Sequence, residues 1–120
     1  MSSIDRPLSG EALRFTLAEE RARVNDPELL KRNGRNARTL VKEGPLRVTV
    51  VMVGAGGRIA PHLTDGPITV QVLDGEIRFR AAGKEHALGA GDLLVVDGGV
   101  EHSVESAAGG TFLLTVVQPK

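Results

Sequence analysis

The chain of 120 residues carries fifteen basic and fifteen acidic side chains and no cysteine. Its length suits a single domain with a sizeable core, and its balanced charge provides no general attraction for nucleic acid or an anionic membrane surface. The absence of cysteine excludes disulfides, thiolate nucleophiles and thiolate metal ligands. No long apolar stretch opens the chain, so we expect a cytoplasmic protein without nucleic-acid or membrane partners.

Residues from about Ser9 to Asn33 have the pattern of a helical arm. Ser9 is a good N-cap, and apolar residues recur after it at near-helical spacing. The stretch NDPELLKRNG then predicts a second start, with Asp26 as the cap and Pro27 at the first helical position, and Gly34 as the stop. We expect this arm to pack on a barrel or on a partner chain.

From Ala37 onward, short runs rich in Val, Leu, Ile and Thr alternate with glycine-containing turn signals. The runs that predict strands are ARTLV, LRVTVVMV, ITVQVL, EIRFRAA, EHALG, DLLVVD, HSVES and TFLLTVVQ. Strands of this number and length are typical of an antiparallel sandwich or a jelly-roll barrel. We therefore expect an all-β fold in which residues 1–36 form the helical arm and residues 37–120 form the barrel.

Two details of these strands lead to specific predictions. Asp74-Gly75 lies between two apolar runs, and an Asp-Gly pair in that position predicts a tight hairpin in which Gly75 takes a positive φ. In the run DLLVV, residues 92–96, four apolar residues follow Asp92 without interruption, which predicts a strand buried in the barrel wall. Gly91 and Gly99 are expected at the turns on either side of that strand.

The chain has only three histidines: His62, His86 and His102. His62 is expected to begin a strand, and His102 follows forty residues later, a separation at which two residues can meet inside a jelly roll. Two facing imidazoles are half of a histidine-rich site for a divalent transition metal, although two polar residues at a barrel mouth would give the same pattern. His86 alternates with Leu88, so we expect it to be packed or at the surface rather than a ligand.

Glycines, histidines and their neighbours recur at fixed spacings in two stretches. The first stretch holds Gly56, His62, Thr64, Ile68 and Gly75, and the second holds Gly91, Asp97, Gly99, His102 and Ser106. These spacings resemble the two motifs of the cupins, G-x5-H-x-H-x3,4-E-x6-G and G-x5-P-x-G-x2-H-x3-N. The resemblance covers about residues 48–106. It implies a double-stranded β-helix, the RmlC-like jelly-roll barrel of small cupins, with the short N-terminal helical arm outside it.

The resemblance also implies a metal site, and this chain departs from the family pattern there. A typical cupin holds its metal with three histidines and one glutamate. By position the chain keeps His62 and His102, but Thr64 replaces the second histidine and Ile68 replaces the glutamate. A threonine hydroxyl is a poor transition-metal ligand and an isoleucine is none. The resemblance therefore implies a partly lost site that binds a divalent transition metal weakly.

We expect the barrel to bind a small organic molecule with one polar or anionic end. Its walls would be apolar, formed by residues such as Ile68 and Val70, and His62, Thr64 and His102 would be the polar anchors. Mixed apolar walls with a few convergent polar groups are the usual lining of a small-molecule pocket. Which molecule fills the barrel does not follow from the sequence.

Other functions stay open. A metal-dependent enzyme of the dioxygenase or isomerase type would use His62 and His102 with a third ligand from Asp65, His86 or the substrate. A metal-free acid–base enzyme has less support, because Glu101 and its neighbour His102 would point to opposite faces of a strand. A structural or regulatory protein would use the arm to dock against another chain.

Sheet edges in a small barrel have to be covered, and an open apolar edge invites pairing with another chain. We therefore expect a homodimer. Its interface should use an edge strand around ARTLV, residues 37–41, and part of the helical arm.

Overall fold

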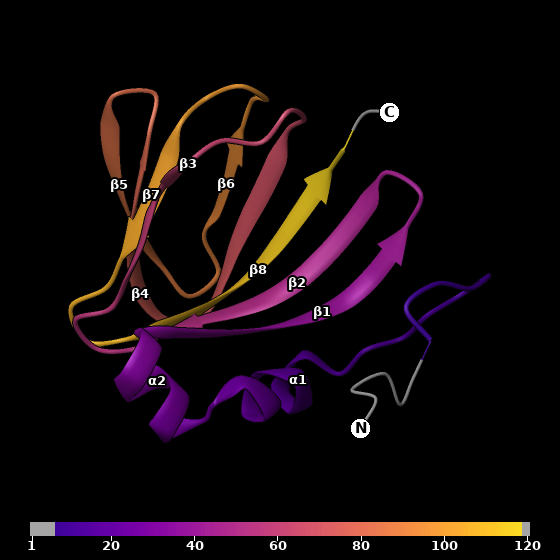
Figure 1. The fold of residues 1–120 in the computed structure, drawn as a ribbon, viewed down its shortest axis with the longest axis horizontal. Helices are drawn as coiled ribbons and strands as arrows, with labels where there is room; N and C mark the ends of the chain where they lie inside the picture. Colours follow the sequence, from indigo (N-terminus) through magenta and orange to yellow (C-terminus); the bar gives the residue numbers. More distant parts are fainter. Residues whose placement is uncertain (1–6, 119–120) are drawn as a thin grey trace.

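The computed structural model describes residues 7–118, which form a curled antiparallel sheet with two short helices against its outer face (Figure 1). The strands are β1 (Arg35–Glu43), β2 (Leu46–Val53), β3 (Arg58–His62), β4 (Ile68–Ala81), β5 (Lys84–Gly89), β6 (Leu93–Val96), β7 (His102–Glu105) and β8 (Gly110–Val117), and the helices are α1 (Leu17–Val24) and α2 (Pro27–Asn33). The predicted all-β jelly-roll architecture is confirmed. Within the described range, neither helix has the length and apolar character needed to cross a membrane.

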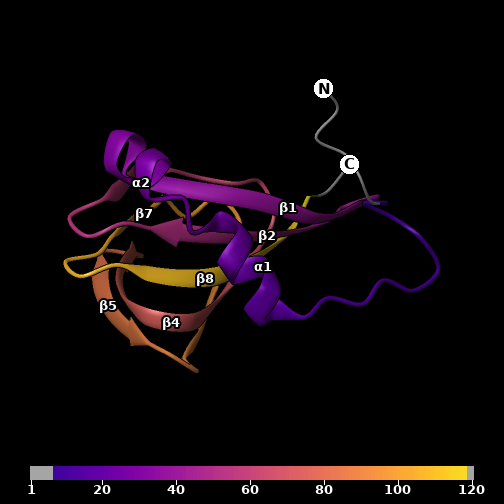
Figure 2. The same ribbon diagram turned by 90° about the horizontal axis from the view of Figure 1, so that it is seen from below.

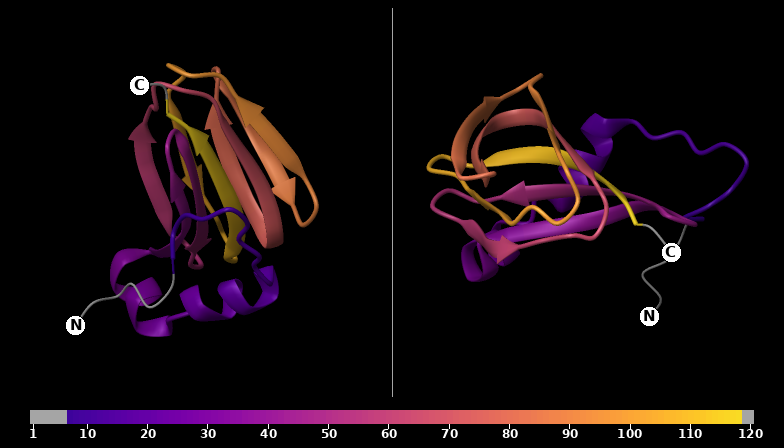
Figure 3. Two further views of the ribbon diagram at one scale, coloured as in Figure 1. Left: turned by 90° about the vertical axis from the view of Figure 1, so that its right-hand side faces the viewer. Right: turned by 90° about the horizontal axis from the view of Figure 1, so that it is seen from above.

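The long strand β4 connects the two halves of the sheet. Its first part pairs with β8 and β6, and its second part pairs with β7 and β5, so the main strand order is β1-β2-β8-β4-β7-β3. Because one strand belongs to both halves, the sheet curls and the halves face each other across an apolar interior (Figure 3). This interior is where residues distant in sequence meet.

The predicted hairpin at Asp74-Gly75 is wrong, because β4 runs through this dipeptide without a break. Gly75 does take a positive φ, of 71°, but the pairing of β4 with β8 shifts register between Val72 and Asp74, which marks a bulge. A Cβ at Gly75 would lie 2.3 Å from the carbonyl oxygen of Gly109, so the close approach of the two strands requires glycine there. The dipeptide thus bends one strand from the first half of the sheet into the second.

The hairpin that follows β4 lies at Ala82-Gly83, a dipeptide that is not a usual turn signal. Ala81 pairs with Lys84, and the two residues between them have φ values of 55° and 74°. Two successive positive φ values describe a type I′ turn, which matches the twist of the flanking strands. Alanine is an unusual first residue for this turn, which explains why the pattern was missed.

Two further strands differ from expectation. His62 ends β3 rather than beginning a strand, and β3 itself was not predicted, because it contains Pro61 and its pairing with β7 is irregular. The strand β6 was predicted to be buried, but Leu93 and Val95 are 61% and 63% exposed. Only one face of β6 points into the core, and a continuously apolar run does not reveal that.

The apolar side chains form two clusters on opposite faces of the sheet. The larger cluster fills the interior between the two halves, and the smaller one lies between the outer face and the N-terminal arm. The smaller cluster is built on Val24 from α1, Leu40 from β1 and Val50 from β2, with Phe15 and Leu17 packed against it. The arm therefore covers part of the outer face, as Figure 2 shows.

The first helix of the arm begins at Leu17, so the prediction that helix starts after Ser9 is wrong. The preceding segment follows the sheet edge instead. The backbone N–H of Lys42 donates to the carbonyl oxygen of Leu8 at 2.8 Å, and the N–H of Gly10 donates to a carboxylate oxygen of Glu43 at 3.0 Å. These contacts with β1 compete with the first helical turns that the apolar spacing suggested.

The second helix forms as predicted. The Asp26 side chain accepts hydrogen bonds from the backbone N–H groups of Glu28 and Leu29, Pro27 opens the helix, and Gly34 ends it with φ of 81°. Strand β1 begins directly afterwards at Arg35, inside the segment 1–36 that was predicted as the arm.

Candidate functional site

The structure brings His62 and His102 together, as the motif spacing predicts. The two residues are paired across β3 and β7. Their Nε2 atoms lie 3.2 Å apart, the ring centroids are separated by 4.3 Å, and the ring planes meet at 71°. The forty-residue separation in sequence is bridged by the curl of the sheet, so the pair exists only in the folded chain.

The two rings have different surroundings. His102 is only 4% exposed and stacks on Phe79, with ring centroids 5.5 Å apart and planes at 21°, whereas His62 is exposed at the end of β3. Burial lowers the pKa of His102 below its ordinary value. Its contact with the Val100 carbonyl opposes that shift, and the nearby charge of His62 adds to it.

Both imidazoles are oriented by the same local contact. The Nδ1 atom of His62 lies 3.1 Å from the carbonyl oxygen of Ala60, and the Nδ1 atom of His102 lies 3.1 Å from that of Val100. A carbonyl only accepts, so each Nδ1 must carry a hydrogen and donate it. Each neutral ring then has its lone pair on Nε2. The two lone pairs point at one another and repel unless a proton or a metal ion lies between them.

The donor set fits an open metal site. Two nitrogen ligands at roughly 2.0–2.1 Å from one tetrahedral ion lie about 3.3 Å from each other, close to the 3.2 Å seen here. An Nδ1–H donated to a carbonyl is the usual outer contact of a metal-bound histidine. In residues 7–118, however, no three His, Cys, Asp or Glu side chains are grouped to hold a metal ion. The described residues would thus supply two ligands to a metal ion at this point, fewer than the three or four of a usual protein site.

The other predicted site residues have different roles in the fold. Thr64 donates its hydroxyl to the carbonyl oxygen of Gly66 at 2.9 Å, while Ile68 and Val70 are buried in the interior cluster. Strand β5 carries His86, which pairs with Phe79 of β4 and is half-buried. The contribution of Thr64, Ile68 and Val70 to ligand binding stays a prediction.

Asp65 and His86 were the two protein groups considered as a third ligand. Asp65 is exposed, and no three-ligand group in the described part of the chain includes either residue. Gly98 packs its backbone directly against that of Asp65, since a Cβ at Gly98 would lie 2.1 Å from the Asp65 carbonyl oxygen. This packing holds the loop that carries Asp65 in place.

A small hollow adjoins the buried histidine. Its volume is about 210 Å³, and it is lined by Pro61, Arg80, Ala81, Gly83, Lys84, Glu101, His102 and Ser103. The lining thus combines His102 with two cationic side chains and one carboxylate. Sequence reasoning missed Arg80, Lys84 and the stacking partner Phe79, because nothing in the motif spacings marks them.

Comparison with known proteins places these features in a family context. Residues 49–117 match the model of a family described as the cupin domain. No curated protein sequence matches the chain.

Several solved structures share the fold. A conserved protein of unknown function from Streptococcus pyogenes is 25% identical, with a TM-score of 0.75 over 100% of this chain and 97% of that one. An RmlC-like cupin from Shewanella frigidimarina is 22% identical, with a TM-score of 0.69 over 73% of this chain and 79% of that one. A predicted oxalate decarboxylase from Thermotoga maritima is 22% identical, with a TM-score of 0.65 over 71% of this chain and 81% of that one. The last two likenesses concern the fold alone.

Proposed function

This chain belongs to the cupin family, and we propose that it is a small-molecule-binding cupin whose His62–His102 pair anchors the oxygen-donor end of a small organic acid. The observation that carries the proposal is the pair of Nε2 atoms 3.2 Å apart, each made an acceptor by the carbonyl contact of its own Nδ1. Such a pair attracts a cation, and a cation with open positions attracts an anionic ligand.

The two Nε2 atoms would hold a divalent transition-metal ion. When bound, the ion would act as a Lewis acid toward an oxygen of the ligand. Because the described residues provide only two ligands, the ligand's own oxygens would have to complete the site. Metal and organic ligand would therefore bind more tightly together than either does alone.

The surroundings of the pair favour a small, acidic ligand. The hollow beside His102 has a volume of about 210 Å³, below the roughly 300–1,000 Å³ of pockets for drug-sized molecules. Lys84 lines it and attracts negative charge, which Glu101 in the same lining partly offsets. Arg80 follows Phe79 on β4, so its side chain points to the opposite face of the sheet from the His102 ring, and it contacts Glu85 at 3.7 Å. Phe79 fixes the plane of the His102 ring by stacking on it.

The alternative is a metal-dependent enzyme. Open positions on the ion are also what Lewis-acid or oxygen chemistry requires. The two functions differ in how the ion is held. An enzyme of this kind should retain its metal through purification, whereas the proposed binding protein should lose it on dialysis and regain it together with a ligand.

Elemental analysis of the purified protein and calorimetric titration with Ni²⁺, with and without a small dicarboxylic acid, would test the proposal. We expect weak binding of Ni²⁺ that tightens when the acid is present. His62→Gln should abolish Ni²⁺ binding, because it removes one of the two nitrogen ligands. The variant should still fold, because His62 is exposed and its loss leaves the core intact. His86→Gln removes a histidine of β5 that lies outside the His62–His102 pair, and it is the matched control. Unchanged binding in His62→Gln would refute the site, and tight metal retention by the parent would favour the enzyme.

We also propose that the chain forms a homodimer. Strand β1 stands at the end of the strand order, and the apolar side chains of Leu93 and Val95 are exposed on β6. An edge strand and exposed apolar groups both favour association with another copy. Light scattering across a dilution series should show the dimer, and a stable monomer at high micromolar concentration would contradict it.

A further inference from the structure

A second hollow lies beside the N-terminal arm at the edge of the sheet that β1 forms, and residues from both faces of β1 and β2 line it. Its volume is about 500 Å³, within the usual range for small-molecule sites. It is lined by Leu8, Arg23, Val24, Asn36, Ala37, Arg38, Thr39, Lys42, Arg47 and Thr49. None of these residues belongs to the histidine pair or to the hollow beside it.

The lining is strongly cationic. Four of its side chains are basic, namely Arg23, Arg38, Lys42 and Arg47, and no carboxylate of the described residues is part of it. The hydroxyls of Thr39 and Thr49 and the amide of Asn36 add neutral polar groups. A concave surface with this composition concentrates anions, since its positive charges act together within a confined space.

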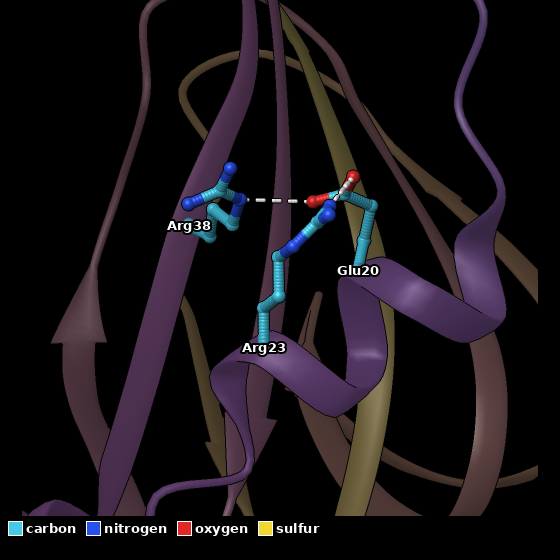
Figure 4. Close-up of polar contacts among 3 residues, drawn as sticks. All are labelled: Glu20, Arg23 and Arg38. Atoms are coloured by element: carbon cyan, nitrogen blue, oxygen red, sulfur yellow. Dashed lines mark hydrogen bonds and ion pairs between the residues drawn. The ribbon is translucent and has the colours of Figure 1, made fainter. Parts of the chain in front are cut away.

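Two of the four cations are held in place by a buried carboxylate (Figure 4). Glu20, on α1, is 4% exposed. Its Oε2 accepts from Nη1 of Arg23 at 2.6 Å, and its Oε1 accepts from Nε of Arg38 at 2.9 Å. Each contact engages one nitrogen of a guanidinium that has five N–H donors. Glu20 therefore orients both arginines and offsets one of the four positive charges, so the hollow stays cationic.

The other two cations lie on the other face of the sheet, because Arg47 is next to Val48, which packs in the outer cluster, and they are placed opposite one another. Lys42 of β1 and Arg47 of β2 are partners in the antiparallel register, and like charges in directly opposite positions destabilise a sheet. Within residues 7–118, no ion pair joins either of them to a carboxylate. An anion bound between them would relieve this repulsion.

The arm borders the hollow on the outer face of the sheet. Asn36 donates its amide to the carbonyl oxygen of Val24 at 3.0 Å, which ties β1 to the end of α1. Arg21 of α1 forms an ion pair with Asp74 at the β4 bulge. The position of the cationic walls is thus set by contacts that do not depend on an occupant.

We propose that this hollow is a second binding site, for a small molecule that carries two or more negative charges on phosphate or carboxylate groups. Arginine suits this ligand class because its planar donors match the oxygens of phosphate and carboxylate. The site is separate from the histidine pair and goes beyond the function proposed for it.

NMR titration of the ¹⁵N-labelled, metal-free protein with pyrophosphate, and separately with citrate, tests the site at constant ionic strength. We expect saturable shifts centred on the backbone amides of Asn36, Thr39 and Thr49. Binding of both probes would mean that negative charge alone is enough for recognition. A preference for one probe would identify the ligand as a phosphate or as a carboxylate. The His62→Gln variant should bind each probe as the parent does, which separates this test from that of the histidine pair.

The decisive variant is Lys42→Gln/Arg47→Gln, which leaves the Glu20 contacts intact. We expect it to weaken probe binding tenfold or more while the dispersed spectrum of the fold is retained. Lys31→Gln/Arg32→Gln removes the same charge from the exposed surface of α2 and should bind as the parent does. An equal loss of probe binding in both variants would mean that the loss comes from the change in net charge and not from this hollow. No saturable shifts, shifts centred elsewhere, or unchanged binding in the first variant would overturn the proposal.

Discussion

The two faces of the sheet each bury an ionisable side chain, and they do so in opposite ways. On the inner face His102 is buried beside another imidazole and an aromatic ring, so burial lowers its pKa and favours the neutral form. On the outer face Glu20 is buried between two guanidinium groups that hydrogen-bond both of its oxygens. The comparison shows two ways to bury an ionisable group. A neutral ring is buried where a positive charge would have no counter-charge, and a carboxylate is buried where cations converge and pair with it.

The largest expected effect comes from placing an unpaired charge on the inner face. Thr64→His/Ile68→Glu rebuilds the ligand set that the family resemblance implies. Ile68 is 2% exposed in the core, so a glutamate there should cost several kcal/mol, roughly 3–5, without a metal ion. Urea unfolding with and without Ni²⁺ should show a strongly destabilised variant that the metal restores.

The parent is the control for that experiment, and its stability should change little with Ni²⁺. If the double variant folds but gains no affinity for the metal, the four motif positions do not converge on one point. The inner face would then lack the geometry that the family pattern implies.

A smaller effect is expected from removing the partner that the outer face provides. Glu20→Gln keeps the shape of the side chain but leaves Arg38, whose side chain is three-quarters buried, without its counter-charge. We expect a loss of about 1–3 kcal/mol in the free energy of unfolding, measured by urea denaturation. The neighbouring Glu19→Gln changes an exposed carboxylate and should stay within about 0.5 kcal/mol. Equal effects in both variants would mean that the buried pair does not stabilise the arm.

The smallest effect is the pH dependence of stability that the burial of His102 adds. The pKa of His102 is lowered in the folded protein, so the unfolded chain binds more protons as the pH falls below about 6.5. The contribution of neutral His102 to the free energy of unfolding is therefore complete above that pH, and it is lost as the pH falls toward the pKa of His102 in the folded protein. NMR titration of the metal-free protein should show a His102 ring that titrates below 6.5.

His62→Gln sharpens this test, because it removes the nearby charge that helps to lower the pKa of His102. We expect the His102 titration in that variant to move upward but to stay below 6.5, since burial is the larger cause. An unperturbed His102 in the parent would show that the ring is solvated.

The sequence by itself was sufficient for most of the strands, although not for β3 or for the continuity of β4. It was also sufficient for the caps of α2 and for the meeting of His62 with His102. These are local or periodic properties: short β-branched runs favour strands, and Asp26-Pro27 and Gly34 satisfy the helix ends through backbone geometry. The histidine pair followed from the motif spacing, because that spacing reflects a sheet that curls in a known way. The residue types of Thr64 and Ile68 were enough to predict a partly lost ligand set. Binding of a metal or an organic acid by the histidine pair stays a proposal.

Only the tertiary structure decided where the chain bends, what is exposed and which charges meet. Asp74-Gly75 makes a bulge rather than a hairpin because β8 pairs alongside β4 through this point. Leu93 and Val95 are exposed because β6 has neighbours on one face only. Glu20 reaches Arg38 across eighteen residues because apolar packing sets α1 against the outer face. Each depends on contacts between elements far apart in the chain, and local sequence preferences do not encode them.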